Sequence, residues 1–183
     1  MDKNPSQQPF LSDVRTLRER ARQNLDKGAV TSTYEGDVDK TVEILQNVLA
    51  TEIVCVLRYT MHAVSASGIS SEGAKEEFAE HAKEEAEHVQ EVAERISQLG
   101  GKPNFNPQGL EMRAASEYGT ADNLVEMIKE NLIAERVAIE HYQELIRYFA
   151  NHDPGTRSML ERILRVEEEH ADDMHDLLVA HQG

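Results

Sequence analysis

Four long segments of the chain carry apolar residues at steps of three and four, and ionisable residues interrupt each stripe near its middle. In the stretch around EHAKEEAEHVQEVAERI the stripe includes Phe78, Ala82 and Val92. Glu85 and His88 occupy its centre. An ionised carboxylate inside a helical core is so unfavourable that it must be neutralised, paired or bound to a cation. The fold therefore has to bring compensating groups to the same level.

The four segments predict four long helices whose ends carry capping signals. The helices are expected from Asp37 to Gly68, from Ser70 or Ser71 to the Gly100-Gly101 pair, from Thr120 to the break NHDPG, and onward from Asp153 with Pro154 in the first turn. Residues 101–119 contain two prolines and three glycines, so they form a long connection with one short helical turn. Two short links and one long link predict an all-α four-helix bundle with a crossover connection.

The N-terminal residues 1–36 form an extension before the bundle, which we assign to residues 37–183. The extension contains a short helical pattern, SDVRTLRERARQNLDKG, from Ser12 to Gly28. The arm MDKNPSQQPF carries a single lysine. Because 34 acidic residues oppose 19 basic ones, for a net charge of -15, nucleic acid and anionic membrane surfaces are disfavoured as partners.

Neither a membrane span nor a secretory signal is expected. No apolar run reaches the roughly 20 residues of a span, and the N-terminus lacks the apolar core of a signal peptide. The expected location is the cytoplasm. Cys55 is the only cysteine, which excludes an intramolecular disulfide, a four-cysteine zinc site and a rubredoxin-like iron site. Its apolar neighbours in IVCVL predict a small buried residue.

The ionisable residues that interrupt the four stripes form a regular constellation. They are Glu52 in the first helix, Glu85 and His88 in the second, Glu135 in the third, and Glu167 and His170 in the fourth. Residues three apart project from the same helical face, so each Glu-x-x-His pair can offer a carboxylate and an imidazole to one site. Glu52 precedes Glu85 by 33 residues and Glu135 precedes Glu167 by 32, so two hairpins place their acids at matching heights. Four carboxylates and two imidazoles at one level indicate a pair of divalent metal ions.

This pattern resembles the ferritin-like di-iron arrangement. More narrowly, EEAEHVQEVAERISQLGGKP and VEEEHADDMHDLL resemble bacterioferritin, and the resemblance covers residues 37–178. It implies a ferritin-like four-helix bundle with two iron ions per chain. It also implies that Glu52 and Glu135 are terminal ligands, that Glu85 and Glu167 bridge the irons, that His88 and His170 are terminal imidazole ligands, and that Tyr59 and Tyr142 lie near the irons.

The sequence departs from bacterioferritin in three places. Ala86 stands where bacterioferritin takes its haem through a methionine, so haem is not supported. Only 13 residues follow His170, too few for the short fifth helix of the large shells together with the end of the fourth. With the N-terminal extension, these features resemble twelve-subunit Dps-like shells that carry a bacterioferritin-type site, although the paired cysteines of some such proteins are absent. A 12-mer is therefore favoured over a 24-mer.

The resemblance implies a ferroxidase that oxidises Fe(II) with O2 or H2O2 and stores ferric mineral inside a homo-oligomeric shell. A di-metal peroxidase or manganese catalase of the same fold is the first alternative, because the ligand set does not exclude manganese. A Dps-like DNA-protecting protein is the second, although DNA binding needs basic tails that neither end provides. The third is a non-catalytic helical bundle whose buried acids are only hydrogen-bonded.

Other residues near these motifs have simpler interpretations. Tyr59 and Tyr142 also fit as core residues with hydrogen-bonded hydroxyl groups. Glu168 and Glu169 are expected to point outward, because Glu167 is the residue three before His170. The remaining histidines are expected on the solvated surface: His62, His81, His141, His152, His175 and His181.

Overall fold

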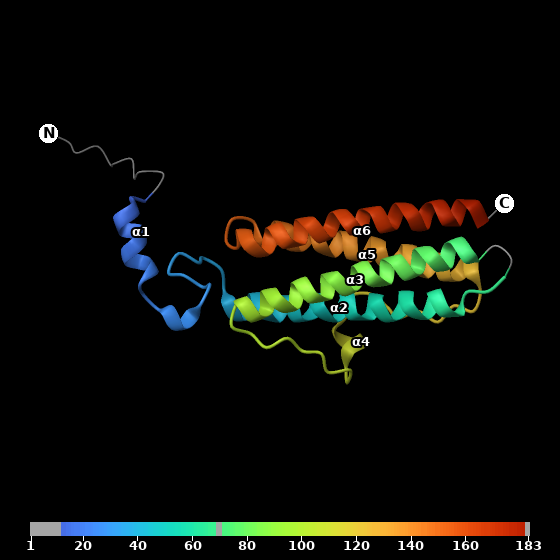
Figure 1. Ribbon diagram of the computed structural model, residues 1–183, viewed down its shortest axis with the longest axis horizontal. Coiled ribbons are helices and arrows are strands. Elements are labelled where there is room, and N and C mark those ends of the chain that lie inside the picture. The colour runs from blue at the N-terminus through green and yellow to red at the C-terminus, as the bar shows by residue number, and fades with distance from the viewer. Residues whose placement is uncertain (1–11, 69–70, 182–183) are drawn as a thin grey trace.

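The computed structural model describes residues 12–68 and 71–181, and the long elements in these ranges are helices (Figure 1). They are α1 (Val14–Ala21), the 3-10 turn η1 (Leu25–Lys27), α2 (Val38–Ser65), α3 (Glu72–Gln98), α4 (Leu110–Arg113), α5 (Leu124–Phe149) and α6 (Pro154–His181). The N-terminal arm MDKNPSQQPF, the alternative cap Ser70 and the last two residues lie outside the described residues. Among the helices of the described ranges, none is long and apolar enough to cross a membrane.

Two helical hairpins form the bundle, one from α2 and α3 and the other from α5 and α6 (Figure 1). The long connection between α3 and α5 returns along α2 and carries the single turn α4, as the sequence predicted. Helix α1 stands apart, beyond the end of the bundle where α2 begins, and has no buried residue (Figure 1). The predicted all-α four-helix bundle with a long crossover and an extra N-terminal helix is confirmed.

Two of the four predicted bundle caps are formed as expected. The side chain of Asp37 accepts a hydrogen bond from the Lys40 amide at 3.0 Å, and α2 begins at the next residue. Asp153 accepts from the Thr156 amide at 2.9 Å, and α6 begins with Pro154. In both places the side chain satisfies a backbone N–H that the first helical turn leaves without a partner.

Other boundaries differ from the prediction. Helix α5 begins at Leu124 and is capped by Asn123, so the expected start at Thr120 is wrong. The Thr120 amide instead donates to the Glu130 carboxylate, which holds the end of the crossover against α5. Helix α2 ends at Ser65, three residues before Gly68.

The predicted N-terminal helix is also shorter than expected. It is capped by Asp13 rather than Ser12, because the Asp13 carboxylate accepts from the amides of Arg15 and Thr16. It ends at Ala21, and Gly28 follows the separate turn η1.

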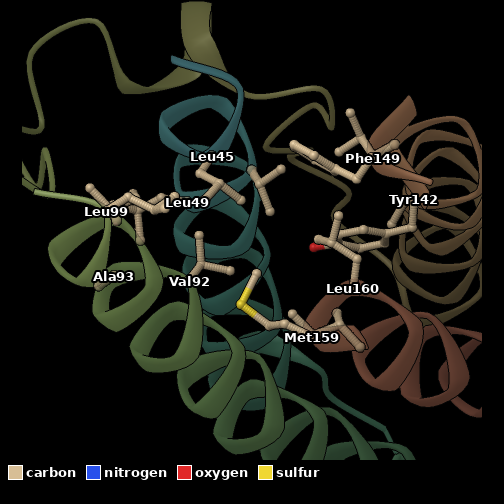
Figure 2. Close-up of a cluster of buried hydrophobic side chains, with 14 residues drawn as sticks. Leu45, Leu49, Val92, Ala93, Leu99, Tyr142, Phe149, Met159 and Leu160 are labelled. Carbon is tan, nitrogen blue, oxygen red and sulfur yellow. The ribbon is translucent and has the colours of Figure 1, made fainter. Parts of the chain in front are cut away.

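A polar layer divides the interior of the bundle into two hydrophobic clusters. The larger cluster includes Leu45, Leu49, Val92, Ile96, Tyr142, Phe149 and Leu160. Figure 2 shows side chains from both hairpins converging in this cluster. The smaller cluster includes Tyr59, Phe78, Met127, Ile128 and Met174. Because apolar packing surrounds the intervening layer along the bundle axis, its polar groups are removed from bulk water.

The crossover is fixed to α2 by hydrogen bonds to its backbone. The Thr51 hydroxyl accepts from the Ala115 amide at 2.9 Å. The guanidinium of Arg58, which is fully buried, donates to the Glu117 carbonyl at 2.9 Å. These bonds give partners to backbone amide and carbonyl groups of the crossover, which has no regular secondary structure at this point.

Replacing Asp153 should destabilise the bundle more than losing an ordinary helix cap does. Besides capping α6, the buried Asp153 carboxylate accepts from Arg95 at 2.8 Å and from the Tyr34 hydroxyl at 2.9 Å. We expect Asp153→Ala to lower the free energy of unfolding by roughly 2–4 kcal/mol, because it removes a cap and leaves Arg95 without its carboxylate. Chemical denaturation of the variant measures this loss.

Asp37→Ala is the matched control, because Asp37 is exposed and caps α2 only through the Lys40 amide. It should cost about 1 kcal/mol. Equal losses in the two variants would show that the contacts to Arg95 and Tyr34 contribute nothing beyond the cap.

Candidate metal centre

The polar layer between the two hydrophobic clusters contains one ionisable group or pair from each helix of the bundle. Helix α2 contributes Glu52, α3 contributes Glu85 and His88, α5 contributes Glu135, and α6 contributes Glu167 and His170. All six side chains are buried, and the most exposed residue, His88, retains 6% of its accessible surface. The structure thus brings together all six residues that the sequence selected.

Donor atoms of these side chains form two overlapping groups. One group contains Glu52, Glu85, His88 and Glu167, and the other contains Glu85, Glu135, Glu167 and His170. Within each group, the four donor atoms lie within 4.8 Å of one another. Glu85 and Glu167 belong to both groups, which is the geometry required of carboxylates shared by two metal positions.

The contacts inside the first group are too many for ordinary hydrogen bonding. His88 Nδ1 lies 3.1 Å from a Glu167 oxygen, 3.3 Å from a Glu52 oxygen and 3.4 Å from a Glu85 oxygen. A single ring N–H cannot donate well to three acceptors in different directions. Convergence of one nitrogen and three carboxylates on a small volume fits a cation better than it fits a hydrogen-bond network.

The second group leaves several buried donor atoms without hydrogen bonds among the described residues. His170 Nδ1 is 3.6 to 4.0 Å from the nearest carboxylate oxygens, beyond hydrogen-bond range. The other buried atoms of the centre without a partner are Glu52 Oε2, Glu85 Oε1, Glu135 Oε2 and both oxygens of Glu167. Buried polar atoms are normally satisfied, so a set of such oxygens and nitrogens facing one another fits bound divalent cations.

The two tyrosines bind the terminal glutamates from the opposite hairpin. Tyr59 on α2 donates from its hydroxyl to Glu135 Oε1 on α5 at 2.6 Å. Tyr142 on α5 donates to Glu52 Oε1 on α2. Each bond orients a carboxylate and leaves its other oxygen, Oε2, facing the centre. The tyrosines are also core residues of the two clusters with hydrogen-bonded hydroxyl groups, as the simpler interpretation predicted.

His170 is oriented by a residue that sequence reasoning did not single out. Its Nε2 lies 2.8 Å from Glu84 Oε2, while Nδ1 faces the centre. A carboxylate that accepts from one ring nitrogen favours the tautomer whose other nitrogen is free to bind a metal. Glu84 directly precedes Glu85 on α3, so no helical stripe could have identified it.

The four carboxyl groups divide into two whose pKa is raised and two whose pKa is lowered. Burial, and then repulsion from Glu85 and Glu167, raises the pKa of Glu52 well above its usual value. Burial and the same two carboxylates raise the pKa of Glu135. Burial also acts to raise the pKa of Glu85 and Glu167, but interaction with the nearby imidazoles of His170 and His88 outweighs it and lowers the pKa of both groups.

The two histidines of the centre hold protons in the absence of metal. Burial opposes the charged form, but interaction with the nearby carboxylates of Glu167 and Glu85 raises the pKa of His170 to about 11. Burial also acts to lower the pKa of His88, but the carboxylate of Glu167, followed by that of Glu52, raises it well above its usual value. Two imidazolium ions therefore balance two carboxylates, and two neutral carboxyls complete an uncharged layer.

Two histidines expected on the surface are buried, so that prediction is wrong for them. His62 is fully buried and lies 3.4 Å from the carboxylate of Glu130 on α5. His81 is 1% exposed and packs on the ring of His170, one of the six residues of the centre. His81 is seven residues before His88, so the helical spacing did contain the signal that the two share a face.

A surface groove between α3 and α6 leads to the centre. It has a volume of about 360 Å³, and His88 lies in its lining. Four carboxylates line it, from Glu84, Glu87, Glu91 and Glu169, together with Arg162 and Arg165, and Arg162 pairs with Glu91 at 2.7 Å. Concentrated acidic groups raise the local concentration of cations, so this groove offers a route for metal ions.

Fold and site together define a four-helix bundle with buried carboxylate and histidine groups that could hold metal. The model of the ferritin-like domain matches residues 42–182 of the sequence. The chain therefore belongs to the ferritin-like family, as the sequence motifs implied. No curated protein matches the sequence significantly.

Solved structures with the same fold include close and distant relatives. A bacterioferritin-related protein from Bacteroides fragilis, described as a dodecameric thioferritin, is 32% identical over 80% of this chain and 88% of its own, with a TM-score of 0.76. A ferritin-like di-iron carboxylate protein from Bacillus anthracis str. Ames is 26% identical over 77% of this chain and 96% of its own, with a TM-score of 0.68. Dps from Thermosynechococcus elongatus shares the fold, at 20% identity over 76% of this chain and 90% of its own, with a TM-score of 0.73.

The metal-free protein should lose stability as the pH rises from about 7 to about 8. Glu52 and Glu135 have raised pKa values, so the folded state keeps protons that the unfolded state loses above the ordinary value of 4.5. His88 and His170 add the same effect above their ordinary value of 6.5. Burial lowers the pKa of His62, His81 and His141, and these groups oppose the effect at about pH 6.5 and below. Above that range they are neutral in both states, so the folded state binds more protons and its stability falls with pH. Melting temperatures of the metal-free protein across the window measure the slope.

The double variant Glu52→Gln/Glu135→Gln keeps the shape of both side chains and removes two of the titrations. Its stability should depend less on pH, and it should be the more stable protein at about pH 8. An equal slope in the variant and the original protein would contradict the assignment of protons to these two carboxyls.

Proposed function

We propose that the protein oxidises Fe(II) with O2 or H2O2 at this buried centre and stores the ferric product as mineral. The observation that carries the proposal is the pair of overlapping donor groups that share Glu85 and Glu167 and contain buried oxygens without partners. Membership of the ferritin-like family supports it. In this proposal the functional unit is the bundle, residues 37–183, and residues 1–36 are an extension.

Each residue has a defined role in the proposed reaction. Glu52 and His88 hold one Fe(II), Glu135 and His170 hold the other, and Glu85 and Glu167 bind both. Two Fe(II) ions held side by side supply two electrons together, enough to reduce O2 to the level of peroxide or H2O2 to water. Tyr59, Tyr142 and Glu84 act on the ligands by orienting them.

Exchange of protons for metal keeps the centre neutral in both states. Without metal, Glu52, Glu135, His88 and His170 carry one proton each, and the charges of the layer cancel. Two Fe(II) ions bring four positive charges, which balance four ionised carboxylates beside two neutral imidazoles. Binding two ions therefore releases four protons, and affinity falls as the pH drops.

The proposed product compartment is the interior of a homo-oligomeric shell. The 32% identical relative from Bacteroides fragilis is described as dodecameric, which supports twelve subunits for this chain too. The groove with acidic lining between α3 and α6 would then admit Fe(II) to the centre.

Anaerobic titration of the metal-free protein with Fe(II), followed by stopped-flow mixing with O2 or H2O2, tests the proposed activity. We expect saturation near two Fe(II) per chain and rapid oxidation. Glu52→Ala and His170→Ala each remove a ligand from one group, so both should weaken binding and slow oxidation by at least about tenfold.

Glu168→Ala provides the matched control, since Glu168 neighbours Glu167 on α6 but is exposed. It should behave as the original protein. Oxidation that is equally fast in all variants would mean that the reaction occurs elsewhere, and repeating the experiment with Mn(II) and H2O2 would reveal a catalase instead.

The mass of the assembly in solution tests the proposed shell. Twelve chains of 20.6 kDa give about 250 kDa, and twenty-four give about 490 kDa. Size-exclusion chromatography with light scattering should return the smaller mass. A dimer or a 24-mer would contradict the dodecamer.

A further inference from the structure

A second cluster of donor atoms lies next to the centre, between α3 and α6. His81 Nε2 is 3.3 Å from a carboxylate oxygen of Glu77 and 3.4 Å from one of Asp173. The three donor atoms all lie within 4.8 Å of one another. None of these three residues belongs to the two donor groups of the centre, and the sequence motifs selected none of them.

The imidazole of His81 is held rigidly in this position. Its ring stacks on His170 with centroids 3.9 Å apart and an interplanar angle of 23°, and meets the Tyr59 ring edge-on at 5.2 Å. The residue is 1% exposed, yet Nδ1 has no hydrogen-bond partner in the described part of the chain. Its contacts with protein are ring packing on one side and two carboxylates on the other. The nitrogen that faces both carboxylates is Nε2, so the packed ring presents one fixed donor atom to them.

The two carboxylates face solvent as well as the ring. The side chains of Glu77 and Asp173 retain 34% and 50% of their accessible surface. Burial, and then repulsion from Asp173, raises the pKa of Glu77. Two carboxylates brought together beside an imidazole are relieved by a divalent cation, and one imidazole with two carboxylates suits Fe(II), Mn(II), Co(II) or Zn(II). The open side leaves room for water ligands and for exchange.

We propose that Glu77, His81 and Asp173 form a third divalent-cation site in each chain. The site is accessible from solvent and is connected to the centre through the stacked rings of His81 and His170. Glu84, which lies 2.8 Å from His170 Nε2, is placed with His81 and His170 in one further group of donor atoms. A continuous series of ligands thus runs from the exposed Asp173 to the buried centre. The inferred role in passing iron along this series rests on the proposed ferroxidase function, whereas binding of the cation does not.

Co(II) binding separates this site from the centre, because Co(II) has the required ligand preferences and a visible spectrum that reports ligation. The assembled metal-free protein is dialysed against Co(II), and the bound metal is counted per chain. We expect three Co(II) in the original protein and one in Glu52→Ala/Glu135→Ala, in which the centre is disabled. Adding Asp173→Asn or Glu77→Gln to that double variant should remove the last ion.

Asp172→Asn is the control for a general loss of surface charge. Asp172 neighbours Asp173 on α6 and belongs to a separate exposed acidic group with His175 and Asp176, so a nonspecific surface ion would respond to this change instead. The substitution should leave the last Co(II) in place when added to the double variant. The added Asn and Gln substitutions conserve side-chain size, and circular dichroism verifies that every variant, including the double variant, remains helical.

The outcomes distinguish failure of this inference from failure of the proposed function. Two Co(II) in the original protein and none in the double variant would overturn the third site and leave the proposed centre intact. A different result would overturn the proposed centre and support the third site. In that case the original protein and the double variant would each bind one Co(II), and Asp173→Asn would remove it. With more than three Fe(II) per chain, Asp173→Asn should slow oxidation severalfold, and an unchanged rate would overturn the role in passing iron.

Discussion

The requirement to neutralise four carboxylates in the core of a helical bundle governs this structure. Isolated charges in such a place cost several kcal/mol each. Without metal, the raised pKa values of Glu52, Glu135, His88 and His170 favour the forms that cancel these charges, and in the proposed function a pair of divalent cations takes over this role. The centre can therefore exchange protons for metal without acquiring net charge. This balance explains how the same buried residues are compatible with a folded protein in both states.

The surrounding packing turns this electrostatic balance into a defined geometry. The two hydrophobic clusters hold the helices above and below the polar layer. Tyr59 and Tyr142 each join one hairpin to a glutamate of the other, so the register between the hairpins is tied to the orientation of the ligands. Arg58 connects the same level of α2 to the crossover and to Asn131 on α5. Displacing one hairpin would thus disturb hydrogen bonds and ligands together.

Much of the fold was predictable from local sequence signals. Helical periodicity and the caps Asp37 and Asp153 identified the long helices, because these signals act over a few residues. The start of α5 was not predictable in this way. Asn123 and Thr120 are both acceptable caps, and the choice depends on the crossover, where Glu130 binds the Thr120 amide. The spacing of His81 to His88 indicated a shared helical face, but the burial of the His81 ring is completed by Tyr59 and His170 from other helices.

The sequence by itself determined which residues could share a face of each helix, since a period of 3.6 residues relates Glu85 to His88 and Glu167 to His170 whatever surrounds them. Only the tertiary structure decided that Glu85 and Glu167 enter both donor groups, that Glu84 orients His170, and that Glu77, His81 and Asp173 meet. These relations join residues from different helices. The distances between these side chains depend on how the two hairpins pack and on which rotamers the packing permits. Helical periodicity carries no information on either.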